Sequence, residues 1–501
     1  MDCFDDRSTP SPTESFEGED WHYDDSRVLP WIESMKQGLN SDDDAVVAHA
    51  LKEIKDFVAI YSTDSGWNQD SIYYSYLLVP QVIQRLYQLF FHAKLNVPVA
   101  DTIDAMSSEN WHIFTEPSFV RQLTVSVADL SLDATHHSSI TRIIRRLVAY
   151  GDANLKQELL RMGLVDSLVS FVSSCRSLDA RGATLFSQSL VNVAWAASEL
   201  LSSAEEVSAT AAESLSAVLM QLLQSTDVDL VSEVVSVMHF HSFSTEALTC
   251  LCRRDLTTCL LWVLRERSDW HSPAHFMLVK SLQVIRSAVL SHPANAVLIV
   301  DQIQRTWTLE SFFTFFLKQH QSRGSTEVEL AIDILSVFPP HQLVHQNLVA
   351  AVLSFTRGII HSQVDAKSRY PPSNLNDVLA FIISISRSDA AHPLLQECLE
   401  ANIISLLQES VTHFGLQTDT VTLCLEVLAQ LLDFPDSQLH QEVVSQLSSS
   451  LDLLSKIEEQ LLLDASHELS NRILSFCCTG ASAAARWSGD VLHLMHGMRL
   501  G

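Results

Sequence analysis

The chain has 501 residues, and 47% of them are hydrophobic, which is enough to bury a sizeable core and excludes disorder throughout. Its formal net charge of −28 works against binding to nucleic acid or anionic membranes and favours a basic protein partner, although solubility alone explains the acidity equally well. The 13 glycines and 14 prolines are far fewer than the roughly 35 and 25 of average usage, which favours helices joined by short loops.

Residues 1–27 are rich in Asp and Glu, opposed only by Arg7 and Arg27. Because this segment cannot bury enough apolar surface to offset the entropy of ordering, we expect a disordered acidic tail. It lacks the basic and apolar regions of a signal peptide, and no uncharged apolar stretch in the chain is long enough for a transmembrane helix. The nine cysteines are scattered without a CxxC pair, which favours a reducing compartment. We therefore expect a cytoplasmic protein, with shuttling to the nucleus as an alternative.

From residue 28 to residue 501 the pattern is helical almost without pause. Residues 45–60 place apolar side chains at three- and four-residue steps, which predicts an amphipathic helix. The pair Gly151-Asp152 combines a helix stop with an N-cap, and Pro293 and Pro393 stand where a first-turn proline is tolerated. Alternation with a period of two residues is rare, which argues against a large sheet. We expect one helical repeat domain over residues 28–501.

An internal repeat appears when four helical segments, beginning at Gln81, Gly163, Asp255 and Asn402, are aligned. They share apolar residues at the second and sixth positions, and at the tenth where the frame extends, which is one buried stripe of a helix. The first three segments lie near multiples of a unit of roughly 40–47 residues, the size of armadillo and HEAT repeats. Such a unit cannot bury its own apolar face, so neighbouring units must stack.

The segment 154–203 resembles the armadillo-repeat superfamily. Residues 159–169 look like the second helix of such a repeat, which leads off with a glycine, and residues 192–201 look like the third helix of an importin-α repeat. That family carries a Trp and, four residues later, an Asn on its groove face; here the positions are Trp195 and Glu199. The resemblance implies an all-α, armadillo/HEAT-type α-solenoid, a right-handed superhelix of stacked helical repeats.

Asn192, Trp195 and Glu199 are spaced to share one helix face, and we predict that they bind a partner protein. Trp195 could cover the stem of a Lys or Arg, whose charge Glu199 would pair. The alternative is that Trp195 packs between repeats. The densest basic patch comprises Arg142, Arg145, Arg146, Lys156 and Arg161. It suits either an anionic partner or a solvated helix face.

No motif of an enzyme or a metal site is found. His341 and His345 are four residues apart, but nearby residues offer no further ligand, and zinc needs three or four. The pairs His136-His137 and His239/His241 point apart on a helix. Nucleotide-binding loops and nucleophile elbows are absent from the sequence. No cofactor and no metal are expected, and the chain is not expected to be an enzyme.

The function predicted from the sequence is a non-catalytic scaffold or adaptor. It would bind a segment of a partner protein, a basic segment by preference, on the concave face of the solenoid, and neither nucleic acid nor membrane is expected as a partner. Two alternatives stay open: a divergent importin-α-like carrier of basic localisation signals, and an exchange factor or chaperone cofactor with the same fold.

Overall fold

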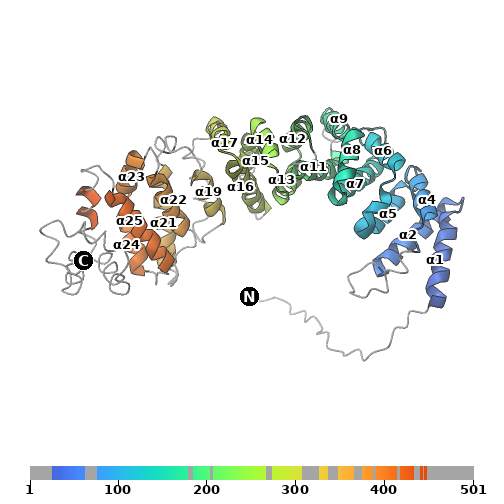
Figure 1. The fold of residues 1–501 in the computed structure, drawn as a ribbon, viewed down its shortest axis with the longest axis horizontal. Coiled ribbons are helices and arrows are strands. Elements are labelled where there is room, and N and C mark those ends of the chain that lie inside the picture. Colours follow the sequence, from blue (N-terminus) through green and yellow to red (C-terminus); the bar gives the residue numbers. More distant parts are fainter. Residues whose placement is uncertain are drawn as a thin grey trace, which may run out of the picture. The chain divides into compact units, whose positions relative to one another are not determined.

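The structure is a computed structural model, and it describes the following residues: 25–61, 76–178, 184–203, 207–266, 273–306, 326–336, 343, 348–365, 375–387, 391–413, 418–433, 441–443 and 445–447. Within these residues the secondary structure is helical, without a strand (Figure 1). The expected tail falls on residues 1–24, outside the described residues, and on residues 25–27, which form the start of the first helix. None of the helices described is long and apolar enough to cross a membrane.

The chain divides into two compact units. The first comprises residues up to 126 together with 131–155, and the second comprises 127–130 and everything from residue 156 onward. The helices of the first unit are α1 (Asp25–Leu39), α2 (Asp44–Tyr61), α4 (Pro80–Phe90), α5 (Asn96–Asn110), the 3-10 helix η1 (Trp111–Phe114), α6 (Pro117–Ser126) and α7 (Ala134–Tyr150). Helices α2, α5 and α7 pack side by side in one row, and α1 and α4 pack against its members α2 and α5.

The second unit repeats this arrangement over more helices. After α8 (Ala153–Arg161), which crosses the boundary between the units, come α9 (Leu164–Arg176), α11 (Ser187–Ser202), α12 (Ala209–Leu223), α13 (Val228–Phe240), α14 (Thr245–Arg253), α15 (Leu256–Glu266), α16 (Pro273–Ser291), α17 (Pro293–Thr306), α19 (Thr326–Ser336), α21 (Leu348–Asp365), α22 (Leu375–Ser386), α23 (Ala391–Glu400), α24 (Ile403–His413) and α25 (Thr418–Asp433). Consecutive contacts link α11, α13, α16, α19, α22 and α25 into one row. Helices α9, α12, α15 and α17 form a second row beside it.

Local signals in the sequence place these helices correctly. Helix α2 buries six of the apolar side chains predicted for its core face, while Val46 is exposed. Gly151 caps α7, and Asp152 Oδ1 accepts a hydrogen bond from the Leu155 amide at 2.8 Å as α8 begins. Pro293 opens α17.

The aligned repeat frame is confirmed by backbone conformation. Its second and sixth positions are buried in all four segments. Its first position has a positive φ in three of them: Gly163 at 87°, Asp255 at 61° and Asn402 at 61°. Each of these residues stands between two consecutive helices, where a left-handed residue ends one helix before the next begins. In the earliest segment the helix already begins at Pro80, so the first position there is helical.

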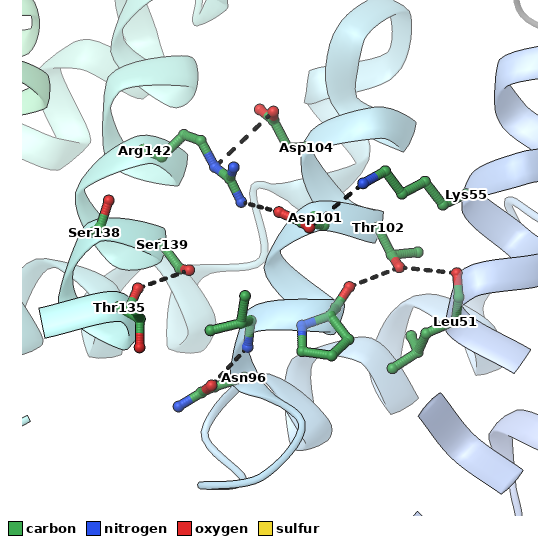
Figure 2. Close-up of polar contacts among 12 residues, drawn as sticks. Leu51, Lys55, Asn96, Asp101, Thr102, Asp104, Thr135, Ser138, Ser139 and Arg142 are labelled. Carbon is green, nitrogen blue, oxygen red and sulfur yellow. Dashed lines mark hydrogen bonds and ion pairs between the residues drawn. The ribbon is translucent and has the colours of Figure 1, made fainter. Parts of the chain in front are cut away.

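Neighbouring repeats are also joined by polar contacts about one repeat apart in sequence. In the first unit, Asp101 of α5 accepts from Arg142 of α7 at 2.7 Å and from Lys55 of α2 at 3.4 Å (Figure 2). Arg146 donates to Asp104 at 2.8 Å. Burial raises the pKa of Asp101, but Arg142 and Lys55 outweigh it and hold the pKa below its usual range. The predicted basic patch thus pairs Arg142 and Arg146 with carboxylates.

Candidate partner-binding site

Helix α11 carries the three residues predicted to bind a partner, and it packs between α12 and α13. Asn192 is 2% exposed and lies in the core, so it offers no surface to a partner. Trp195 and Glu199 are half-buried, one helical turn apart. Of the three residues predicted on this face, Trp195 and Glu199 therefore reach the surface and Asn192 is buried.

Two basic side chains of the chain itself contact the carboxylate of Glu199. Lys156 Nζ of α8 lies 3.2 Å from Oε1, and His241 Nε2 lies 3.4 Å from Oε2. These two groups, His241 first, hold the pKa of Glu199 below its usual range. Lys156 also donates to Ser203 Oγ at 2.9 Å. Glu199 is thus charged at neutral pH, and its charge is already compensated within the fold.

His241 links this ion cluster to an aromatic one. It caps the C-terminus of α13, and its Nδ1 donates to the Val237 carbonyl at 2.7 Å. The Trp195 ring lies edge-on to His241 with a centroid distance of 4.9 Å, and 5.2 Å from Phe240. Phe240 is 72% exposed, although it is large and apolar. We call Trp195, Phe240 and His241 the aromatic platform.

A cleft of about 510 Å³ opens beside the aromatic platform, between α13, α14 and α16. Buried apolar side chains of all three helices form its inner wall: Met238, Leu248 and Val284. Leu290 of α16 also lines it and is 52% exposed. The volume falls within the range of about 300–1,000 Å³ that is usual for ligand sites. We call this space the α13–α16 cleft.

The polar residues of the cleft are cationic or neutral. Its lining includes His239, His241, Gln283, Arg286 and the hydroxyl groups of Ser242, Ser287 and Ser291, and no carboxylate belongs to the described lining. Arg286 Nε donates to Asp333 Oδ2 of α19 at 2.6 Å. Burial lowers the pKa of His239, and the nearby charge of Lys280 lowers it further.

The sequence pattern predicts Trp195 and Glu199 as binding residues, a prediction that stays open, but it does not point to Phe240, His241 or the cleft. The segment His239-Phe240-His241 was considered for metal binding alone. The contacts of this segment depend on where α13 ends, because His241 is the C-cap of α13 and from there contacts Glu199 of α11. Within the described residues no three metal-ligating side chains cluster together, while His341 and His345 lie outside them.

Comparisons with known proteins agree with the helical rows. No family model matches the chain, and no curated protein matches it. A chain from the solved structure of a conserved phosphorylation switch that controls the interaction between cadherin and beta-catenin aligns with a TM-score of 0.50 and 12% identity, covering 90% of this chain and 82% of that one. A designed armadillo repeat protein aligns with a TM-score of 0.32 and 14% identity over 62% of this chain and 100% of its own. At such low identity the first alignment shows the fold alone: the chain is an all-α, armadillo-type α-solenoid.

Proposed function

We propose that this chain is a non-catalytic scaffold that binds a segment of a partner protein over the aromatic platform. The exposed Phe240 ring carries the proposal. An isolated exposed apolar residue needs no explanation, but Phe240 packs on the half-buried Trp195 and stands beside a cleft of ligand size. Aromatic side chains that are large, rigid and partly exposed are the residues that anchor protein interfaces.

The fold supports the same proposal. Each repeat of a solenoid contacts only its neighbours, so a row of helices such as α11, α13 and α16 offers a continuous surface along which an extended or helical segment can lie. A protein chain in the cadherin and beta-catenin structure has this fold, and that structure concerns the interaction of two proteins. The net charge of −28 favours a basic partner through long-range attraction.

The contacts of Glu199 favour the general scaffold over an importin-α-like carrier. A carrier of basic signals needs carboxylates that accept the lysines of its cargo, whereas Glu199 is already contacted by Lys156 and His241. A cargo lysine would have to displace Lys156. Among the residues that the structure describes, no contact specifically favours the role of an exchange factor or chaperone cofactor.

The test is an affinity capture in which the wild type is compared with Phe240→Ser and Trp195→Ala. Trp262→Ser is the matched control, because Trp262 is also a partly exposed aromatic, 45% exposed, but lies on α15 of the second row. We expect one set of proteins to be retained by the wild type and the control and lost from both platform variants. Equal retention by all four proteins would refute the platform as the binding surface.

A further inference from the structure

The α13–α16 cleft differs in charge from the chain as a whole, which is acidic. The whole sequence has 60 acidic and 32 basic residues, yet the described lining of the cleft contains Arg286 and two histidines and no acidic residue. A surface site with this composition is complementary to an anionic group, even on a protein that repels anions at long range.

Arg286 retains hydrogen-bonding capacity toward the cleft. Its Nε–H is taken by Asp333, but a guanidinium has five N–H donors. The two terminal amino groups of Arg286 make no hydrogen bond within the part of the chain that the structure describes. They are able to meet a carboxylate in the paired geometry that arginine favours.

Lys280 adds a positive charge that no described carboxylate neutralises. Its Nζ donates to Ser236 Oγ of α13 at 2.9 Å, and among the described residues it forms no ion pair. Its charge acts on His239, which lines the cleft. Asp333 offsets the charge of Arg286, whereas Lys280 keeps a positive charge without an ion pair close to His239.

Part of the lining of the cleft is apolar and accessible. Leu290 lies on the rim, half exposed, above the buried Met238, Leu248 and Val284. This combination of an apolar wall with a cationic edge suits one kind of occupant. We propose that the α13–α16 cleft receives a segment of a partner protein in which an aliphatic or aromatic side chain stands next to an Asp or Glu.

This inference rests on the proposed function and narrows it. The apolar side chain of the partner contacts Leu290 and the wall behind it, and the neighbouring carboxylate meets Arg286 and Lys280. The next part of the partner segment contacts the aromatic platform, which lies on α11 and the C-terminal end of α13 in the same row of helices. Long-range attraction still favours a partner that is basic elsewhere, while this one contact requires an acidic residue.

The test uses three fluorescently labelled peptides that share a central Leu-Phe anchor and differ only in flanking residues: Glu, Gln or Lys. Binding to the full chain is measured by fluorescence anisotropy at low and moderate salt. We expect the Glu-flanked peptide to bind about tenfold more tightly than the Lys-flanked peptide, and the preference to shrink as salt is added.

Two variants locate the binding. Leu290→Ser is expected to weaken the binding of the Glu-flanked peptide about tenfold. Val297→Ser on α17, at a residue with the same 52% exposure, is expected to leave the affinity unchanged. Lys280→Glu is expected to abolish the preference for acidic flanks. Charge reversal at the exposed Lys52 of α2, Lys52→Glu, is the matched control, because Lys52 also forms no ion pair among the described residues, and it is expected to keep the preference.

Equal binding of the three peptides, preference for Lys flanks, absence of binding, or equal effects of Leu290→Ser and Val297→Ser would each overturn the inference. These results would leave the proposed function standing if Phe240→Ser still released captured proteins. Loss of specific capture by the wild type as well would remove the proposed function itself.

Discussion

Replacing the left-handed residue at the start of α9 tests the repeat frame directly. Gly163 has a φ of 87°, and a Cβ added there would meet nothing within 4 Å. Gly163→Ala therefore creates no clash, and its cost is that of placing an L side chain in the left-handed region, about 1–2 kcal/mol. The reduced entropy of the unfolded chain returns about 0.4–1 kcal/mol, so we expect a net loss of about 1 kcal/mol.

Asparagine at the equivalent place in the later repeat supplies the internal control. Asn tolerates the left-handed region better than Ala, so Gly163→Asn is expected to cost less than Gly163→Ala, and Asn402→Ala is expected to destabilise the fold. Asn402→Gly removes strain but adds unfolded-state entropy, which leaves a change of less than about 0.5 kcal/mol.

The assay is urea unfolding followed by far-UV circular dichroism. A loss of about 1 kcal/mol lowers the midpoint by about 0.3–1 M for slopes of about 1–3 kcal/mol/M. Because solenoids can unfold in stages, the variants are compared at equal slope, and hydrogen exchange in α9 and α24 reports the local effect. An unchanged midpoint for Gly163→Ala, or equal losses for Gly163→Ala and Gly163→Asn, would refute the role of backbone conformation at this position.

Three further predictions concern polar contacts between repeats. Arg142→Gln removes one of the two partners that hold down the pKa of Asp101. A depressed carboxyl pKa adds stability at pH values above the ordinary pKa of Asp, so the variant should be about 1 kcal/mol less stable at pH 7. In pH-dependent unfolding the difference should vanish as the pH falls through the lowered pKa. Glu397 is buried and accepts hydrogen bonds from the first-turn amides of α21, and its pKa is raised, mainly by desolvation. The free energy of unfolding of the wild type should therefore fall as the pH rises from the ordinary pKa of Glu to the raised one. Over that range the stability of Glu397→Gln should rise relative to that of the wild type. A double-mutant cycle of Lys156→Met and Glu199→Gln should give a coupling free energy of about 1 kcal/mol in unfolding experiments. A value near zero would show that this half-buried pair does not stabilise the fold.

The fold was predictable because its signals are local. The apolar stripe recurs in each segment that begins at Gln81, Gly163, Asp255 or Asn402, and the periodicity alone indicates which side chains are buried. The glycine at position 163 marked a helix junction. Asp255 and Asn402 carry the same left-handed conformation without glycine, and only the alignment of the repeats connected them with Gly163.

The candidate site was predictable only in part, because it depends on contacts between repeats. The spacing of Asn192, Trp195 and Glu199 predicts that they share one helix face, but how deeply each is buried depends on the helices packed against α11, and Asn192 is buried. The partners of Glu199 lie more than 40 residues away on either side, at Lys156 and His241. No pattern within a single helix reveals such pairs.

The most direct test of the scaffold function places a photoreactive group on the aromatic platform. The variant Phe240→p-benzoylphenylalanine is irradiated in a cell extract, and the linked proteins are identified by mass spectrometry, with Trp262→p-benzoylphenylalanine as the control. We predict that position 240 links to a defined segment of a partner protein and that position 262 does not. Identical products from both positions, or no linked protein at position 240, would contradict the account.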